Sequence, residues 1–553
     1  MSRKQSQKGK ADPALIEEIK DIKTLREIIE YGTKKGGDKR HYVFLNDKKQ
    51  EEERSFNQTW DEIVALGTWY YMHGMDGQKK ICIIAENSYE WIIAYYATLV
   101  GDNITVPMDI KLDDDDIVDQ IVRCGCDGIV YTEKTSHFID ALKNNPENPV
   151  KEYFYIPDFP EYKKAGREAY KNGDTRFVDA VVKPDDLAAI VYTSGTTGKS
   201  KGVMLTQHNI TSNIIASSCT NSGSHAMGFL PLNHTFCWVS ALFVCYILSE
   251  WGYICDSIAP KSLANDMKKY HPQNFAAVPL VAESIYDQIW RTARKTGQEK
   301  KLKAGLRISK TLMKLGIDRR RKIFKTIIDN LGGELEFIFC GGAYIDSRYE
   351  TGMYDFGIQL LSGYGLTECS PAVTCNSLFD FKLGSVGKPL PCNVIKIADP
   401  DEDGVGEIMV KGDNVMKGYF RDPEATAEVF DGEWFRTGDY GWIDEDGFLF
   451  FRGRKKNLIV LSNGKNISPE ELEDKLRSIE FVSEVLVYQE NDQITAEFFL
   501  NEDEYPDARD QLKARVNAVN ETLPSFKRIT RTKIRDTEFE KTTTLKIVRS
   551  NHL

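Results

Sequence analysis

The chain has 553 residues, of which 41% are hydrophobic and 28% charged, as in a globular protein of about two to four domains. Its formal net charge of −11 gives no electrostatic support to nucleic-acid binding. The first ten residues lack the apolar core of a secretory signal, and the longest apolar stretch, 238–248, is about half as long as a bilayer span. We expect a disordered start at 1–20, a buried helix at 238–248 and no transmembrane segment.

The first half of the chain alternates short β-rich runs with helix-length segments. The runs lie at 81–85 and 128–131, and the longer segments at 89–99 and 116–124. This alternation predicts parallel α/β layers. The acidic residues 113–116 have the composition of a metal cluster, but they directly precede an apolar helical pattern, which favours helix capping and an interaction with the helix dipole.

An apolar run at 187–191 leads directly into residues 192–202, which read YTSGTTGKSKG. Glycines let backbone N–H groups approach an anion, hydroxyls add donors and lysines add positive charge, so this segment is suited to hold phosphates. It is not a Walker loop, because Thr193 stands where that loop needs a glycine, five positions before the Gly-Lys-Ser at 198–200. A plain Gly/Ser/Thr turn after a strand is the alternative.

Eleven cysteines lie between Cys82 and Cys392, and none follows the paired CxxC spacing of a zinc site. Cys124 and Cys126 form the one close pair, and their one-residue gap suits neither a redox nor a zinc motif. Because no secretion signal suggests oxidation, we expect reduced cysteines that mostly belong to the core.

The pattern of the chain changes at about Gly384. Short strands with Gly-rich turns follow, as at 404–410 and 446–451, and predict a mostly antiparallel β subdomain. The charged segment RGRKKN at 452–457 comes next, and the residues after it contain no cysteine. We expect a domain boundary at this segment.

Residues 192–202 resemble the signature loop of the adenylate-forming superfamily, which contains acyl-CoA synthetases, adenylation domains of nonribosomal peptide synthetases, and luciferases. That loop is similar to Thr-Ser-Gly-Thr-Thr-Gly-x-Pro-Lys-Gly, and the chain departs from it only at Ser200, which replaces proline. Further motifs in the family's order extend the resemblance over roughly 54–549. The resemblance implies nucleotide binding by Thr193, Ser194, Gly195, Thr196, Thr197, Gly198 and Lys201.

The same resemblance implies an α/β fold. It consists of a large N-terminal domain of parallel α/β layers with a β-rich subdomain, followed by a small mobile α+β domain. The expected bounds are 21–452 for the N-terminal AMP-binding (adenylation) domain, 453–456 for the hinge and 457–553 for the C-terminal domain of AMP-binding enzymes.

Activating a carboxylate as a mixed anhydride with AMP requires phosphate donors, a magnesium ligand, a ribose anchor and a lysine for the developing charge. Residues 362–368, SGYGLTE, are similar to the family's second motif. There the resemblance implies that Tyr364 stacks on adenine, Thr367 contacts phosphate or the acyl carbonyl, and Glu368 binds Mg²⁺. Glutamate oxygens suit this hard cation. Alone, Gly-Tyr-Gly would be a common turn.

Two further motifs concern the nucleoside. FCGGA at 339–343 resembles the family's glycine loop along the adenine pocket, where bulky side chains would collide with the base. FRTGD at 435–439 resembles the ribose motif, in which Asp439 would accept from both hydroxyls, although an aspartate here could also cap a turn. The expected residues of the adenine loop are Gly341, Gly342 and Ala343.

The last part of the chain carries three features of the family. The hinge motif GRKK places Arg454 near ribose and phosphate and Lys456 at the pivot between domains. Gly464 falls in the loop that the family brings to the active site for thioester formation. Lys546 corresponds to the lysine that neutralises charge during adenylation, but Leu545 replaces the usual preceding glycine. If that glycine has φ > 0, leucine would strain the loop and weaken the first step.

PLNHTF at 231–236 resembles the motif whose histidine lies beside the acyl pocket and the incoming pantetheine arm. A lone histidine is usually structural, but the place of His234 downstream of Lys201, in the family's order, favours a functional role. The residues expected to act in catalysis are Lys546, Thr367, Glu368 and His234.

These features predict an ATP- and Mg²⁺-dependent acid–thiol ligase. It would form acyl-AMP and pyrophosphate, rotate its C-terminal domain about Lys456, and let the thiol of CoA attack. Similarity to long-chain acyl-CoA synthetases at 230–236 and 453–457 implies a fatty acid as substrate. The apolar side chains that would line an acyl tunnel, or else form a core helix, are Phe236, Trp238 and Phe243.

Two alternatives stay open. One is a stand-alone ligase that loads an acyl or aryl acid on an acyl carrier protein in trans. The other is a non-catalytic nucleotide- or acyl-binding homologue, which Leu545 and the unusual Gly-Asp-Asn at 101–103 favour. Against it, a protein that only binds would have little need for the full set of polar groups. The need for ATP and the missing signal predict a cytoplasmic location.

Overall fold

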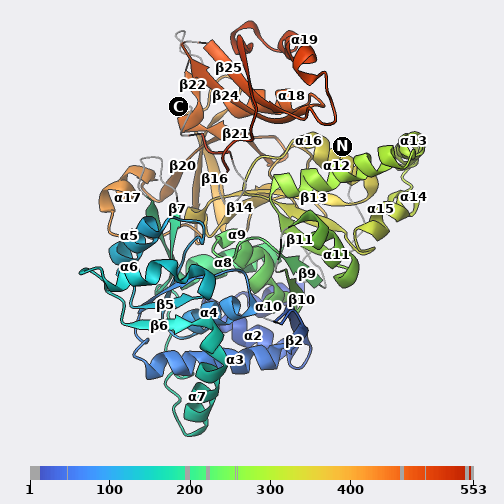
Figure 1. The fold of residues 1–553 in the computed structure, drawn as a ribbon. Coiled ribbons are helices and arrows are strands. Elements are labelled where there is room, and N and C mark those ends of the chain that lie inside the picture. Colours follow the sequence, from blue (N-terminus) through green and yellow to red (C-terminus); the bar gives the residue numbers. More distant parts are fainter. Residues whose placement is uncertain are drawn as a thin grey trace. The chain divides into compact units, whose positions relative to one another are not determined.

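The computed structural model describes residues 13–46, 48–193, 200–219, 225–255, 257, 259–460, 466–491, 493–541 and 547–549. They fall into two compact units (Figure 1). The first holds the described residues up to 394 together with 411–433, and the second holds 395–410 and those from 434 onward. Within the expected disordered start, residues 1–12 lie outside the described part, and Pro13–Ile19 form the helix α1.

The first unit contains a seven-stranded sheet with a parallel centre. β3 pairs in parallel with β4 and β5, and parallel pairing continues from β4 to β7 and from β5 to β6. β7, β8 and β18 pair antiparallel at one edge. The expected runs at 81–85 and 128–131 are the strands β3 and β5, so the predicted parallel layer is confirmed. In sheet order the strands are β18 (Gly418–Tyr419), β8 (Lys201–Thr206), β7 (Leu187–Thr193), β4 (Ile104–Pro107), β3 (Lys80–Ile84), β5 (Gly128–Tyr131) and β6 (Glu152–Tyr155).

A nine-stranded sheet forms the other layer of the same unit. Its centre, from β1 to β13, is parallel, and the strands at its two edges pair antiparallel. Its order is β15 (Lys388–Pro389), β14 (Ala372–Cys375), β13 (Gln359–Gly365), β12 (Phe337–Cys340), β11 (Asn274–Ala277), β9 (His225–Gly228), β10 (Trp251–Ile254), β1 (Arg40–Leu45) and β2 (Glu51–Ser55).

Helices pack against both sheets, as parallel strands require. α4 packs against β3 and β4, α8 against β8, and α16 against β13. The helices of this unit after α1 are α2 (Leu25–Gly36), α3 (Phe56–Met72), α4 (Tyr89–Val100), α5 (Asp114–Cys124), α6 (Ile139–Lys143), α7 (Phe159–Lys171), α8 (Gln207–Ser218), α9 (Thr235–Cys237), α10 (Val244–Leu248), α11 (Pro260–Tyr270), α12 (Pro279–Lys295), α13 (Glu299–Lys314), α14 (Arg320–Ile323), α15 (Lys325–Asn330), α16 (Ser347–Phe356) and α17 (Pro423–Val429).

Three local expectations can be compared with this unit. The apolar stretch at 238–248 is helical and buried, although its first part, Trp238–Phe243, is a π-helix. The acidic residues at 113–116 begin α5, but Asp113 makes no capping hydrogen bond through its side chain, so the helix dipole accounts for them better than capping does. The eleven cysteines are free and most are buried, as expected.

The second unit is rich in antiparallel pairing, which confirms the predicted β subdomain. β20 (Trp434–Ile443) pairs with β17 (Gly406–Gly412) on one side and with β21 (Leu449–Arg454) on the other. A separate three-stranded sheet of this unit packs with α18 (Pro469–Arg477) and α19 (Ala508–Glu521) around a core that includes Leu472, Phe498 and Leu512. The remaining strands of this unit are β16 (Asn393–Ala398), most of which belongs to it, β22 (Ile459–Val460), β23 (Asn466–Ile467), β24 (Val482–Glu490), β25 (Gln493–Leu500) and β26 (Arg531–Arg535). The short strand β19 (Phe430–Asp431) falls within the first unit.

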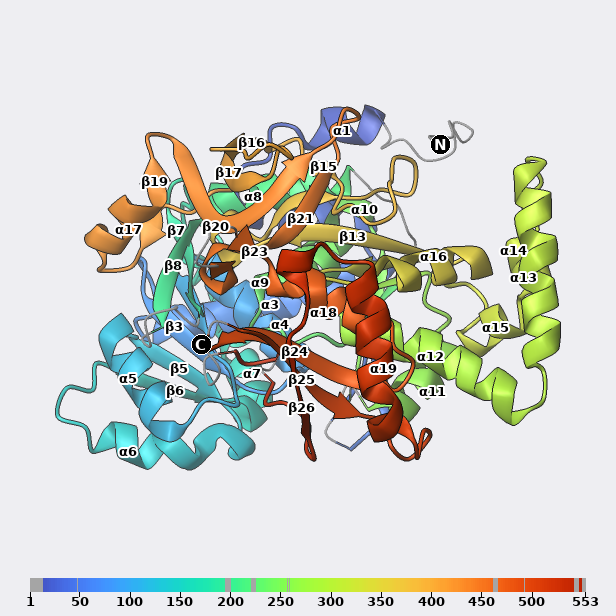
Figure 2. The same ribbon diagram turned by 90° about the horizontal axis from the view of Figure 1, so that it is seen from above.

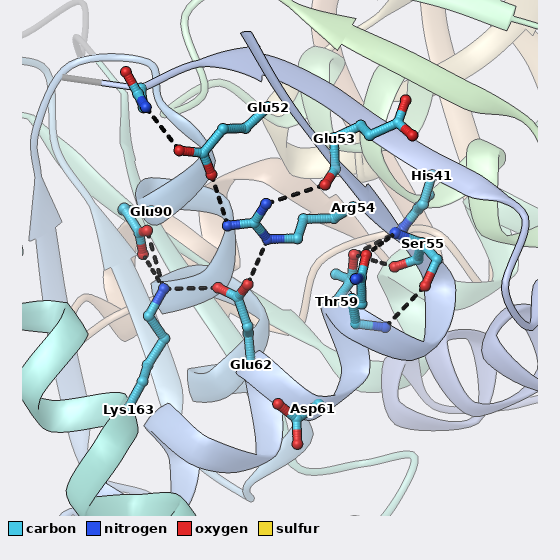
Figure 3. Close-up of polar contacts among 12 residues, drawn as sticks. His41, Glu52, Glu53, Arg54, Ser55, Thr59, Asp61, Glu62, Glu90 and Lys163 are labelled. Atoms are coloured by element: carbon cyan, nitrogen blue, oxygen red, sulfur yellow. Dashed lines mark hydrogen bonds and ion pairs between the residues drawn. The ribbon is translucent and has the colours of Figure 1, made fainter. Parts of the chain in front are cut away.

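A buried ionic network joins three helices of the first unit (Figure 3). The Lys163 ammonium, on α7, lies 2.7 Å from Glu62 on α3 and 3.0 Å from Glu90 on α4. Arg54, at the end of β2, donates from Nε to the other oxygen of Glu62 at 2.7 Å and pairs with Glu52. The network therefore fixes α3, α4 and α7 against one another.

The two carboxyl groups that hold Lys163 respond differently to their surroundings. Burial raises the pKa of Glu90 more than the ammonium of Lys163 lowers it. Burial opposes ionisation of Glu62 as well, but Lys163 and Arg54 together outweigh it and lower the pKa of Glu62. The ionised Glu62 therefore stabilises the fold at neutral pH and loses this contribution when acid protonates it.

We expect Lys163→Met to lower the free energy of unfolding by about 3 kcal/mol at pH 7, because Glu90 loses its cation and the buried Glu62 keeps only Arg54. The loss should shrink as the pH falls toward 5, where the carboxylates of the variant take up protons. Urea unfolding at pH 7 and pH 5 measures both effects.

Arg167→Met, one turn further along α7, is the matched control. Arg167 pairs with Asp61 at the surface, so its loss should cost about 0–1 kcal/mol. Equal losses in the two variants would show that the network contributes no more than a surface ion pair.

Candidate functional site

The neighbouring strands β12 and β13 bring two of the predicted motifs together. They are parallel and in register from Phe337 opposite Gln359 to Cys340 opposite Ser362. The chain leaves β12 at Gly341, beside the point where β13 continues into Gly363. The glycine loop at 339–343 and the motif at 362–368 therefore start side by side at the carboxyl edge of a parallel sheet, where ligands bind in open α/β folds.

The glycine loop lies against the segment that contains His234. A Cβ added to Gly341 would lie 3.3 Å from Cζ of Phe236, so the ring of Phe236 packs directly on this backbone. Gly342 has φ of +85°, which favours glycine, and it is exposed, as is Ala343. This bare, open backbone leaves room for a flat ring, while the role of the loop in holding adenine stays a prediction.

His234 is half-buried at the start of α9. Its backbone N–H donates to Pro231 at 3.2 Å, and its carbonyl accepts from the N–H of Cys237 at 3.0 Å. These contacts hold the histidine beside Phe236 and therefore beside the glycine loop. The structure thus places His234 close to the glycine loop, while its catalytic role stays a prediction.

The three side chains predicted to line an acyl tunnel differ in how deeply they are buried. Trp238 and Phe243 are fully buried and pack against Tyr95, and the indole N–H of Trp238 donates to the carbonyl of Leu232 at 2.7 Å. This packing is that of a core helix, the alternative considered for these two side chains. Phe236 is only half-buried.

The turn that carries Thr367 and Glu368 is anchored through the backbone that follows it. It forms the 3₁₀ helix Thr367–Cys369 directly after β13. The buried amide of Asn213 donates to the carbonyl of Ala372 at 2.6 Å, and the buried amide of Asn414 donates to the carbonyls of Cys369 and Ala372 at 2.9 Å. The Glu368 carboxylate therefore projects from a fixed backbone.

Tyr364 precedes this turn on β13, where it pairs with Thr374 of β14 and is largely buried. Gly365 follows it, and an added Cβ there would lie 2.1 Å from the carbonyl oxygen of Pro371. Only glycine fits this close approach of two backbones. The motif SGYGLTE therefore needs its second glycine for packing as well as for any ligand.

Tyr419 connects two predicted phosphate-site residues that are far apart in the sequence. Its hydroxyl donates to Oε1 of Glu368 at 3.0 Å, and the ammonium of Lys201 lies 4.9 Å from the centroid of its ring. Burial, and then the charge of Glu368, raise the pKa of the Tyr419 hydroxyl, so it stays protonated and acts as the donor. We call Lys201, Tyr419 and Glu368 the phosphate-site cluster.

Sequence analysis did not find Tyr419, because no motif singles it out. It reaches the site through β18, which adds to the edge of β8 with Tyr419 opposite Val203. On β8, Lys201 is the cross-strand partner of Thr193 at the end of β7. The apolar run at 187–191 is thus a strand, as predicted, and two ends of the phosphate loop are placed. The loop residues Ser194, Gly195, Thr196, Thr197 and Gly198 lie outside the described residues.

In the second unit, the predicted ribose and hinge residues are neighbours. Asp439 on β20 and Arg454 on β21 are cross-strand partners, and Nε of Arg454 lies 3.2 Å from Oδ1 of Asp439. Asp439 is buried, and its backbone N–H donates to the hydroxyl of Thr437 at 3.1 Å. The structure therefore holds the Asp439 carboxylate in a defined position. Its cationic partner, Arg454, is half-exposed.

Glu407 is a second buried acid of this unit that sequence analysis missed. Its carboxylate lies 3.2 Å from Arg436 and from Lys455, and it accepts from the N–H of Gly438 at 3.2 Å. It therefore fixes the turn just before Asp439. Because Glu407 lies on β17, far along the chain, no local pattern in the sequence could reveal the pairing.

Lys456 follows this pair in an exposed 3₁₀ turn. Partial desolvation, and then the positive charge of Arg454, lower the pKa of its ammonium group. Gly453 has φ of +149°, and an added Cβ would lie 2.5 Å from Oγ of Ser468, so glycine is required at the start of the hinge motif. Gly464, Leu545 and Lys546 lie outside the described residues.

The part of the chain that the structure describes contains no group of three or more His, Cys, Asp or Glu side chains suited to hold a metal by themselves. Among its helices, none is both long and apolar enough to span a membrane.

Family models match most of the chain. The model described as AMP-binding enzyme matches residues 30–420, and that described as AMP-binding enzyme C-terminal domain matches 456–553. The chain is 29% identical to the long-chain-fatty-acid–CoA ligase 1 of Cavia porcellus, over 87% of this chain and 74% of that protein. It is 31% identical to the long-chain-fatty-acid–CoA ligase 5 of Mus musculus, over 79% and 69% respectively.

Solved structures have the same fold. An anthranilate CoA ligase, AuaEII, in complex with anthranoyl-AMP aligns over 95% of each chain with a TM-score of 0.76 and 17% identity. A fatty acyl CoA synthetase of Mycobacterium tuberculosis aligns over 96% of this chain and 97% of its own, with a TM-score of 0.68 and 19% identity. The motifs, the fold and the family models agree: this chain belongs to the AMP-binding enzymes of the adenylate-forming superfamily.

Proposed function

We propose that the chain activates a fatty acid with ATP to form acyl-AMP and then transfers the acyl group to CoA. The observation that carries this proposal is the phosphate-site cluster, in which Lys201 and Glu368 meet at Tyr419 beside the carboxyl edge of β12 and β13. A cation for phosphate, a carboxylate for a metal and an open glycine loop for adenine are the parts that adenylation requires. The long-chain ligases among the relatives support a fatty acid as substrate.

In the first step, an oxygen of the substrate carboxylate would attack the α-phosphorus of ATP. A new P–O bond forms, the bond to the β-phosphate bridging oxygen breaks, and pyrophosphate leaves. Lys201 would offset negative charge on the phosphates, and Thr193 and residues 194–198 would donate to them. Lys546 would neutralise the charge that develops during the attack, and Thr367 would contact the phosphate or the acyl carbonyl.

We propose that the motifs assigned to adenine and to ribose recognise the nucleoside. Tyr364 and the loop of Gly341, Gly342 and Ala343 would hold adenine, and Asp439 would accept hydrogen bonds from the ribose hydroxyls. Arg454 is paired with Asp439, so we propose that the two side chains face the same part of the nucleotide, with Arg454 near ribose and phosphate.

Glu368 fits a magnesium ion that is bound together with ATP. Mg²⁺ usually takes one or two carboxylates and completes its shell with phosphates and waters. Glu368 offers one carboxylate on a fixed backbone, and Tyr419 engages only one of its oxygens by the hydrogen bond described above. A bound magnesium ion would supply charge compensation for the phosphates.

In the second step, the sulfur of CoA would attack the acyl carbonyl carbon. The C–S bond forms, the bond to the AMP oxygen breaks, AMP leaves, and the thiol proton passes to solvent. We propose that residues 457–553 act as a C-terminal domain that turns about a hinge at 453–456, with Lys456 at the pivot and Gly464 in the loop that reaches the site. N-terminal to the hinge, 21–452 would form the adenylation domain, with His234 beside the acyl group and the pantetheine arm.

An acyl carrier protein acting in trans is the alternative acceptor, and a cytoplasmic location agrees with the use of ATP and CoA. The non-catalytic alternative rests on Leu545 and on the Gly-Asp-Asn at 101–103. These alternatives predict different results in the following experiment.

We expect pyrophosphate release from ATP and Mg²⁺ to depend on added fatty acid across a panel of acids of about two to eighteen carbons and aryl acids. Glu368→Gln and Lys546→Ala should each lower this release by about 100-fold, the usual scale for losing one charge-stabilising group. The exposed Glu424→Gln, in α17, is the matched control and should keep full activity. Each acid is tested with CoA and with a holo-carrier protein.

The outcomes separate the alternatives. Acyl transfer to the carrier but not to CoA would favour the carrier-loading ligase. Measurable ATP binding without pyrophosphate release from any acid would favour the non-catalytic homologue. Aryl acids that outpace every fatty acid would contradict the proposed substrate.

We expect Tyr419→Phe to raise the Mg²⁺ concentration for half-maximal adenylation by about 10-fold, because Glu368 loses the hydrogen bond that orients it. The ring that remains keeps its contact with Lys201, so thermal stability should change little. A titration of activity with Mg²⁺ at saturating ATP measures the effect.

Tyr170→Phe, at an exposed tyrosine of α7, is the control for loss of a hydroxyl. An unchanged Mg²⁺ dependence in Tyr419→Phe, or an equal change in the control, would contradict a role for Tyr419 in placing Glu368.

A further inference from the structure

One segment of the chain has a charge opposite to that of the whole. Residues 291–325 contain fourteen Lys or Arg and only two Asp or Glu, a local excess of twelve positive charges in a chain with a net charge of −11. We call residues 291–325 the basic arm. None of the proposed catalytic or nucleotide-binding residues lies in it, so the proposed function does not account for this charge.

The basic arm consists of the end of α12, all of α13 and α14, and the first residue of α15. In Figure 2, α13 lies along the edge of the first unit. It packs against α12, α14 and α16 through a stripe of apolar or small side chains, among them Leu302, Leu306 and Ser309. Its opposite side is exposed.

The exposed side of α13 carries a row of cations. Positions three and four apart lie on one face of a helix, and this spacing relates the exposed residues Lys300, Lys303, Arg307, Lys310 and Lys314. A helix of sixteen residues is about 24 Å long, so the row is an extended rather than a compact site.

Few acidic groups neutralise this row. Lys303 pairs with Glu299 at 2.6 Å and Lys310 pairs with Asp355 at 2.9 Å. Within the described residues, the side chains of Lys300, Arg307 and Lys314 form no ion pair. A solvated helix face usually mixes both signs of charge in similar numbers, whereas α13 carries one acid, Glu299, beside the five cations of the row.

Large apolar side chains project among these cations. Ile308 is 57% exposed, Leu315 70% and Ile317 44%. All three lie on the second half of α13 or on the turn that follows it, close in sequence to Arg307 and Lys314. Cations beside exposed apolar side chains are the combination found on proteins that lie on a membrane surface.

We propose that the basic arm binds the surface of a bilayer that contains anionic lipids. Its row of cations would meet the lipid phosphates, and Ile308, Leu315 and Ile317 would enter the boundary between headgroups and acyl chains. The apolar stripe of α13 is used in packing on the protein, so attraction between charges supplies most of the binding. This inference goes beyond the proposed function and does not depend on it.

A bilayer fits the arm better than the other polyanions. Single-stranded nucleic acids need exposed aromatic side chains for stacking, and the one aromatic residue of the arm, Phe324, is buried. An acidic protein partner is a separate possibility that the experiment tests. A long, single-signed row with apolar tips matches an extended anionic surface.

We expect the full chain to float with vesicles of phosphatidylcholine and phosphatidylglycerol at about 7:3. With vesicles of phosphatidylcholine alone, it should stay unbound in the bottom fraction. Binding at about 50 mM salt should be largely lost at about 500 mM, because salt screens exposed charges. Vesicle flotation at several lipid concentrations measures the partition coefficient.

The triple variant Lys300→Gln, Arg307→Gln, Lys314→Gln should lower this coefficient roughly 100-fold, since each basic residue near an anionic surface contributes about a factor of five. The matched control is Lys151→Gln, Lys164→Gln, Lys171→Gln, which removes the same charge from exposed positions on and near α7 and should bind as the original chain does. Ile308→Ser with Leu315→Ser should lower the coefficient about 10-fold.

Circular dichroism and adenylation of a short, water-soluble acid verify that each variant is folded. Equal binding to neutral and anionic vesicles, or equal losses in the two triple variants, would overturn the proposal. So would failure to bind anionic vesicles together with saturable binding of an acidic carrier protein, which would assign the arm to a protein partner.

Discussion

The parallel register between β12 and β13 is the constraint on which the candidate site depends. Because Cys340 lies opposite Ser362, the chain leaves both strands at the same edge of the sheet, and the glycine loop and the Tyr364–Glu368 turn start as neighbours. A shift of one residue would turn every side chain of a strand to the other face. The close approach at Gly365 and the amides of Asn213 and Asn414 then hold the backbone around the turn.

In each unit, a predicted site carboxylate already has a donor or a cation. Glu368 accepts from Tyr419 in the first unit, whereas Asp439 pairs with Arg454 in the second. Each partner holds its carboxylate in one orientation, so the acceptor oxygens are positioned before a ligand binds.

The sequence predicts those features of the fold and the site that depend on neighbouring residues and on motifs. The strand at 128–131, the antiparallel pattern after Gly384 and the family all follow from residues close together in the chain. The sequence does not reveal the roles of Tyr419 and Glu407, because strand pairing between distant segments brings each of them to its partners within its own unit. The bond between Lys163 and Glu62 spans 101 positions and is hidden for the same reason. The sequence alone also cannot tell whether apolar residues line an acyl tunnel or form a core helix. The packing around Trp238 shows a core helix there.

Lysine side chains serve two purposes in this chain, depending on whether they are buried or exposed. Lys163 is buried between two carboxylates, so water and salt screen the attraction little and its charge is used within the fold. Lys300 is exposed, so its charge contributes little to stability but remains available to a partner at the surface. Gathering fourteen cations in one arm costs free energy, since neighbouring like charges repel. Ion pairs with Glu299, Asp318, Asp329 and Asp355 relieve part of this repulsion. An anionic surface against the arm would relieve the rest, and the cost that remains in the free protein is the physical argument that the exposed cations of the arm serve binding.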